Sequence, residues 1–68
     1  MKDNKIGGDH YVMKIEPIEF IMRNKIPFAE GNVIKYVSRH RQKNGVEDIL
    51  KAIEYLKFIA FYEYNELL

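Results

Sequence analysis

Residues 30–55 read EGNVIKYVSRHRQKNGVEDILKAIEY, and this stretch decides the fold. Its first half carries apolar residues at helical spacing, which predicts a helix over roughly 28–43. Asn44-Gly45 follows, and glycine accepts the left-handed backbone conformation that closes a helix. Two acids, Glu47 and Asp48, come next and favour the positive end of a helix dipole. The stretch therefore predicts a helical hairpin.

Each helix of this hairpin carries a stripe of polar or aromatic side chains. At about 100° per residue, the stripes are Asn32, Lys35, Arg39 and Lys43 on the first helix and Asp48, Lys51 and Tyr55 on the second. The short turn folds the helices against each other, so cations and an aromatic ring can face one groove. Such a groove suits a phosphate on a nucleobase, because Arg offers a fork of donors, Lys a point charge and Tyr a stacking face. A solvated basic face beside an ordinary hairpin is the alternative, and spacing alone leaves both open.

Length and composition limit the class of protein. Sixty-eight residues make one domain at most, and so short a chain buries only about 60% of its unfolded surface. Without cysteine, disulfides and thiolate metal sites are excluded, which fits a reducing cytoplasm. A net charge of +1 with 31% charged residues is mixed rather than polybasic, so we expect no DNA partner. No apolar run approaches the roughly 20 residues that span a membrane, and we expect no membrane association.

The chain before the hairpin predicts an arm and one more helix. Residues 1–9 form a polar, flexible arm, and His10-Tyr11 is either a ligand-contacting loop or a packed loop. Pro17 suits the first position of a helix over roughly 17–25, which ends before a second proline. Gly31, in the opening turns of the following helix, is explained either by a close helix crossing or by a ligand that lies on it.

The last helix, predicted over roughly 46–66, is apolar nearly all round. Besides a core stripe, it presents Phe58, Ile59, Phe61 and Tyr62 in other directions. A helix that is apolar on every side should be buried on every side, and a three-helix chain of this size cannot surround it. We therefore predict an all-α fold, a single domain over residues 1–68, that forms a homo-oligomer through this helix.

Several catalytic and metal-binding motifs are missing from the chain. There is no G-x-x-x-x-G-K-[ST] phosphate loop. Two histidines, His10 and His40, are too few for a convincing zinc site, so we expect no metal. Ser38 is the only Ser or Thr and lies mid-helix without an obvious base, so we expect no serine nucleophile.

Five segments together resemble one known family. They are His10-Tyr11, Ile15–Phe20, Glu30–Arg39, Gly45–Ala52 and Tyr55-Leu56, and the match covers residues 10 to about 58. This pattern resembles the SaV-like family of small bacteriophage proteins, long labelled a domain of unknown function. A larger phage relative is a nucleoside-monophosphate kinase without a conventional phosphate loop. The resemblance implies nucleotide binding in the cytoplasm of an infected bacterium, with a nucleoside triphosphate as donor if the chain is a kinase and no cofactor otherwise.

Two other functions remain open from the sequence. A small oligomeric phage protein with a basic, aromatic pocket also suits a non-catalytic sponge that sequesters cyclic nucleotides made by bacterial immunity. The exposed aromatics of the last helix suit an inhibitor that binds a host enzyme.

The predicted nucleotide site comprises His10, Tyr11, Glu30, Asn32, Lys35, Tyr36, Arg39, Asp48, Lys51 and Tyr55. The cations are expected to hold the phosphate, Asn32 and Glu30 to read sugar or base, and a tyrosine to stack on the base. His10 is the candidate acid or base if there is turnover. A competing interpretation makes Arg39 the structural partner of Glu47 or Asp48 across the turn.

Overall fold

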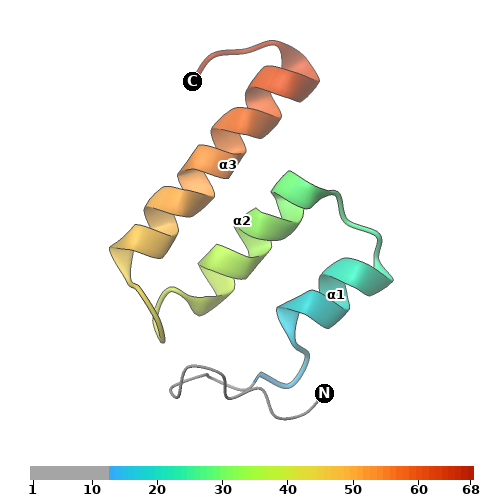
Figure 1. Ribbon diagram of the computed structural model, residues 1–68, viewed down its shortest axis with the longest axis vertical. Coiled ribbons are helices and arrows are strands. Elements are labelled where there is room, and N and C mark those ends of the chain that lie inside the picture. Colours follow the sequence, from blue (N-terminus) through green and yellow to red (C-terminus); the bar gives the residue numbers. More distant parts are fainter. Residues whose placement is uncertain (1–12) are drawn as a thin grey trace.

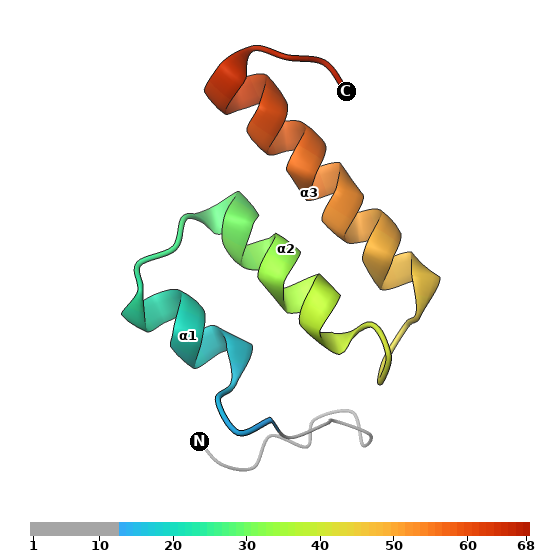
Figure 2. The ribbon, with the colours of Figure 1, turned by 180° about the vertical axis from the view of Figure 1, so that it is seen from behind.

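The computed structural model describes residues 13–68 and contains in that part of the chain α1 (Pro17–Arg23), α2 (Phe28–Arg39) and α3 (Val46–Tyr64). No strand occurs among these residues, which confirms the all-α prediction. Figures 1 and 2 show α2 between α1 and α3, with the helices side by side in one layer. Of its two fellow helices, α1 contacts only α2. The predicted hairpin is therefore α2 and α3, and α1 packs on its outer edge.

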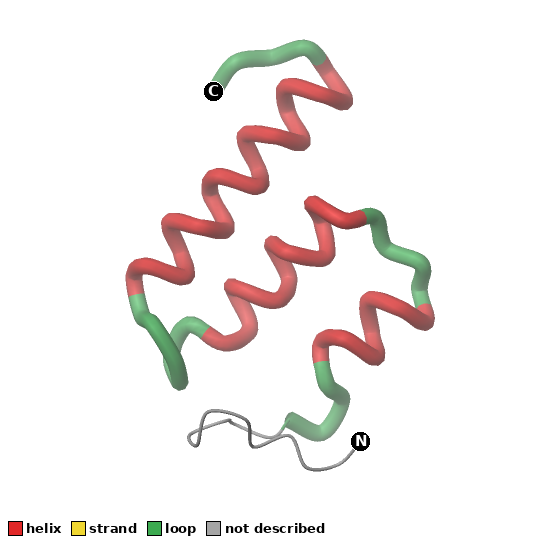
Figure 3. Tube along the Cα trace, in the orientation of Figure 1, coloured by secondary structure: helices red, strands yellow, loops and turns green. Residues whose placement is uncertain are grey.

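Each helix begins where the sequence predicts and ends earlier. α1 ends two residues before the predicted end, α3 two residues before it, and α2 four residues before it. One residue with positive φ follows each helix: Lys25 (53°), Gly45 (59°) and Asn65 (57°). Figure 3 shows the loops that follow these ends. Such a residue reverses the chain locally, so no helix continues through it.

The prediction that α2 continues to Lys43 is wrong for a specific reason. The backbone N–H of Gly45 donates to the carbonyl of His40 at 2.8 Å, which closes the helix. The N–H of Asn44 turns instead to the side chain of Asp48 at 3.3 Å. Lys43 therefore lies in the turn and leaves the stripe in which the sequence placed it.

Gly31 marks the close crossing of α1 and α2. It is buried, and a Cβ built on it would lie 3.1 Å from Cγ2 of Ile21. Of the two explanations for this glycine, the helix crossing is the one that the structure contains.

Replacing Gly31 with valine is expected to destabilise the chain by about 1–3 kcal/mol, the usual cost of forcing extra methyl groups into a packed contact. The two methyl groups of valine extend beyond a Cβ that is already tight against Ile21. Urea unfolding followed by helical circular dichroism measures the change. Ala29→Val, on the same helix, is the control, and equal losses in the two variants would contradict the crossing argument.

The core of residues 13–68 is small. Asp48 is fully buried and Ala52 is 3% exposed, both on α3 where it faces α2. Large apolar side chains of α3 remain exposed, among them Phe58 at 48% and Tyr62 at 75%. No helix in this part of the chain is both long and apolar enough to cross a membrane.

Candidate functional site

A buried ion pair joins the end of α2 to the beginning of α3. The guanidinium of Arg39 donates to both oxygens of the Asp48 carboxylate, from Nε at 3.1 Å and from Nη2 at 3.1 Å. The carboxylate has no exposed area, whereas the Arg39 side chain is 32% exposed. Two parallel charge-assisted bonds fix orientation as well as adding energy. The structure thus contains the ion pair that the competing interpretation of Arg39 predicts, and its partner is Asp48 rather than Glu47.

The turn completes the shell around this carboxylate. Asn44 donates to it twice, from its backbone N–H at 3.3 Å and from its side-chain amide at 3.4 Å. Asp48 also lies in the first turn of α3, where the helix dipole favours a negative charge. The sequence identified Asn44 only as a turn residue. Asn44 lies four residues before Asp48, and this spacing allows the contact. The contact could not be predicted from the spacing alone, because the sequence does not show that Asp48 is buried.

These contacts hold the pKa of the Asp48 carboxyl below its usual value of 3.8. The hydrogen bonds from Arg39 contribute most, those from Asn44 act in the same direction, and burial opposes them. Because the pKa is lower in the folded chain, ionised Asp48 stabilises the fold above the unfolded-state pKa of about 3.9. That contribution is lost as the pH falls through the folded-state pKa.

We therefore expect the free energy of unfolding to decrease as the pH falls below about 4, and the decrease should be smaller in Asp48→Asn. The amide cannot ionise, so the variant lacks this part of the pH dependence while starting from a lower stability. Urea unfolding between neutral pH and pH 3 measures both slopes. Parallel slopes would show that other carboxyl groups carry the acid sensitivity.

Three cations from two helices surround the ring of Tyr36. Lys35 Nζ and Arg39 Cζ each lie 4.8 Å from the ring centroid, and Lys51 Nζ lies 5.5 Å from it. These distances are within the range of cation–π attraction, about 6 Å. Within residues 13–68, the ion pairs involve Arg23, Arg39 and Lys57, and neither lysine of this cluster takes part in one. Asp48 offsets only the charge of Arg39, so no carboxylate of residues 13–68 pairs with either ammonium group of the cluster.

Aromatic rings extend from the cation cluster along α3. Tyr36 and Tyr55 stack with centroids 6.1 Å apart and an interplanar angle of 17°. Phe28 and Phe58 meet Tyr55 edge to face, at 6.0 Å and 5.9 Å. The sequence analysis missed Phe28 as part of this site, because the first residue of a helix carries no periodic signal. The cation cluster therefore borders an aromatic wall made of these four rings.

The structure brings together six of the ten predicted site residues: Lys35, Tyr36, Arg39, Asp48, Lys51 and Tyr55. Asp48 is the one that no ligand can reach directly, since it is fully buried; it positions Arg39 instead. Asn32 lies on α2, and its side-chain amide donates to the backbone carbonyl of Phe28 at 3.1 Å.

The other predicted residues lie apart from the cluster or outside the described chain. Glu30 is nine residues from Arg39, which is about half a turn around the helix axis, so the two side chains start from opposite sides of α2. His10 and Tyr11 lie outside residues 13–68, so their predicted roles stay predictions. Within residues 13–68 no group of three or more His, Cys, Asp or Glu side chains is placed to hold a metal ion.

These features define an all-helical protein with a basic and aromatic cluster on a two-helix hairpin. A family model described as a protein of unknown function, DUF3310, matches residues 5–57. The chain belongs to this family, whose description assigns no activity. No curated protein and no solved structure matches the chain.

Proposed function

We propose that the cluster of Lys35, Arg39 and Lys51 binds the phosphate of a nucleotide. The observation that carries the proposal is the convergence of three cations on one tyrosine ring at 4.8–5.5 Å. Three positive charges gathered around one ring create a local positive potential, and a bound anion would offset it. Lysine and arginine are the usual phosphate ligands of proteins, the first as a point charge and the second as a fork.

The aromatic wall is the reason for proposing a nucleotide rather than inorganic phosphate. Tyr36 and Tyr55 are half-buried rather than buried, so part of each residue remains accessible to solvent. A nucleobase is a flat ring system that gains about 1–3 kcal/mol by stacking on an aromatic side chain. A phosphate held by the lysines and a base against a tyrosine would together use both parts of the site.

The proposal has a catalytic form and a binding form. In the catalytic form the chain is a bacteriophage nucleoside-monophosphate kinase, with a nucleoside triphosphate as donor and the cations neutralising charge on the transferring group. In the binding form it sequesters nucleotide immune signals, cyclic oligonucleotides among them, in the cytoplasm of the infected host. Both forms require the same phosphate contacts. They differ in whether product accumulates.

Calorimetry on the full chain tests the proposal with inorganic phosphate, nucleoside mono- and triphosphates and cyclic dinucleotides as probes. Tighter binding of at least one nucleotide than of inorganic phosphate is expected. Incubating that nucleotide with a nucleoside triphosphate and magnesium then separates the two forms by the appearance of a new phosphorylated product. Absence of binding by every probe would overturn the proposal.

The remaining candidate, an inhibitor that binds a host enzyme, would use the exposed rings of α3. Phe58, Phe61 and Tyr62 are 48%, 44% and 75% exposed, so that surface does call for a protein partner.

A further inference from the structure

The C-terminal turns of α3 extend past the beginning of α2. Phe28, the first residue of α2, already meets Tyr55, nine residues before the last residue of α3. Figure 1 shows the remaining turns beyond the end of its neighbour. The side chains there form a groove of about 360 Å³ lined by Lys57, Phe58, Phe61, Tyr62, Glu66, Leu67 and Leu68. It contains none of the three cations of the cluster, although Phe58 borders both the groove and the aromatic wall.

The aromatic rings of this groove contact one another with the geometry found in protein interiors. Phe58 and Tyr62 lie with centroids 6.5 Å apart, and Phe61 and Tyr62 meet edge to face at 5.0 Å and 79°. Edge-to-face rings pack against other side chains, as in a core. Parallel rings spaced to accept bases between them would favour a nucleic acid, and this arrangement is not of that kind.

The exposed apolar area of the groove is large enough for a small protein–protein interface. With exposed fractions of 48%, 44% and 75% for the rings and 85% and 75% for Leu67 and Leu68, the groove can bury about 500 Å² per copy. Two copies would bury about 1,000 Å², the size at which specific interfaces begin. Aromatic residues are also those most enriched at the centres of interfaces.

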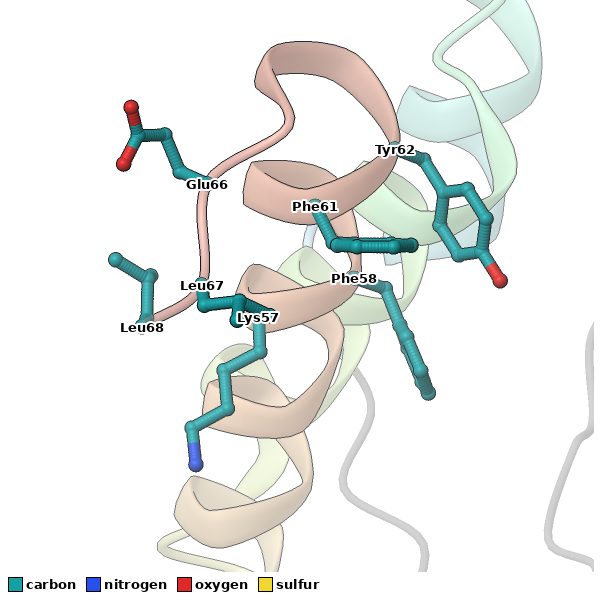
Figure 4. A pocket seen from close by; sticks show the side chains of 7 residues that line it. All are labelled: Lys57, Phe58, Phe61, Tyr62, Glu66, Leu67 and Leu68. Atoms are coloured by element: carbon teal, nitrogen blue, oxygen red, sulfur yellow. The ribbon is translucent and has the colours of Figure 1, made fainter.

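The two charged residues at the rim of the groove favour a second copy of the chain as its partner. Lys57 and Glu66 both line the groove, and Figure 4 shows their side chains extending in opposite directions from its two ends. A twofold axis through the groove places each Lys57 opposite the Glu66 of a second copy, and it does so twice. A surface that carries one cation and one acid around an apolar floor is thus complementary to itself, as an isologous interface requires.

We propose that this groove is the contact between two copies of the chain, with the C-terminal turns of α3 antiparallel to those of the partner. The rings and terminal leucines of both copies form the shared apolar centre. The two Lys57–Glu66 pairs form its rim and set the register.

Sedimentation equilibrium of the full chain over micromolar to submillimolar concentrations tests the contact. The wild type is expected to sediment above the 8.1 kDa of one chain. Phe61→Ala should weaken self-association about thirtyfold, the usual loss at an aromatic centre of an interface. Phe61 is 44% exposed and its ring contact is with Tyr62 of the same helix, so circular dichroism should remain helical; Tyr62→Ala is the second variant if it does not. A helical chain that stays at 8.1 kDa throughout would overturn the proposal, whichever other protein it binds.

A charge exchange tests the register. Lys57→Glu and Glu66→Lys should each weaken association about tenfold, because each places like charges across both rims. An equimolar mixture of the two variants should recover it, since a pair made of one copy of each has one native Lys57–Glu66 contact and one contact of reversed sign. Glu54→Gln is the matched control: it removes the exposed 3.9 Å contact with Lys57 but lies outside the groove. Association that is indifferent to these changes, or a mixture no stronger than its components, would place the interface elsewhere.

Discussion

Replacing Asp48 with alanine is expected to lower the melting temperature by about 10–20 °C, the effect of roughly 3 kcal/mol in a domain of this size. The carboxylate is fully buried and accepts four hydrogen bonds, two from Arg39 and two from Asn44. Removing it leaves the guanidinium without its partner in a partly buried position. The cost lies at the lower end of the range for broken buried pairs because Arg39 is 32% exposed and can regain water.

The stability lost in Asp48→Ala is large relative to the total stability expected for so small a domain. Domains below about 70–80 residues rarely gain more than about 3–5 kcal/mol from their cores. Here the buried residues of α3 are Asp48 itself and Ala52. The ion pair therefore holds α2 on α3 where apolar packing is thin, and its loss should separate the two helices of the hairpin.

Glu47→Ala is the matched control for this experiment. Glu47 is the neighbouring acid, also in the first turn of α3, but it is exposed. Its removal should cost about 0.3–1 kcal/mol, the contribution of an acid to a helix dipole. Thermal unfolding followed by circular dichroism compares the two variants. Equal shifts would mean that Asp48 contributes only as a charge near the helix end.

Sequence periodicity predicted where the helices begin and which side chains share a face. Pro17, Phe28 and Val46 begin the three helices as expected, because proline restriction, capping and apolar spacing act locally. The helix ends were harder to predict, and a residue with positive φ follows each of them. Gly45 was recognisable as one, whereas Lys25 was not, since a lysine rarely adopts a φ of 53° and nothing in its neighbourhood marks the reversal.

The sequence predicted which residues form the cation cluster, but it did not predict what each of them does there. Spacings of three and four residues placed Lys35, Arg39 and Lys51 together, and the structure has them around one ring. The same spacing put Asp48 among the ligand-binding residues. A stripe gives direction around the axis, but whether a position on it faces solvent or a neighbouring helix depends on packing between helices.

Arg39 consequently becomes a poor probe of ligand binding. Its replacement by alanine leaves Asp48 as a buried carboxylate without its guanidinium, so a loss of affinity would be mixed with a loss of stability. The two lysines avoid this difficulty. Both are exposed, and neither forms an ion pair within residues 13–68.

The double replacement Lys35→Ala and Lys51→Ala is therefore expected to weaken nucleotide binding by at least about a hundredfold. One charge-assisted bond to a ligand is worth about 1.5–3 kcal/mol, which is roughly ten- to a hundredfold in affinity, and the variant removes two. Stability should stay the same or rise slightly, because two like charges beside Arg39 are removed together. Calorimetry with the tightest-binding nucleotide and thermal unfolding measure the two quantities separately.

Lys14→Ala with Lys43→Ala is the control for this variant. It removes the same number of positive charges from exposed positions before α1 and in the turn, and neither lysine lies beside the Tyr36 ring or in the C-terminal groove. A general electrostatic attraction between chain and nucleotide would weaken equally in both double variants and would fade with added salt. A bound phosphate in the cluster predicts a large loss in one and little change in the other. If the two variants bind alike, the lysines beside Tyr36 are a solvated basic surface, and the phosphate contact lies elsewhere in the chain.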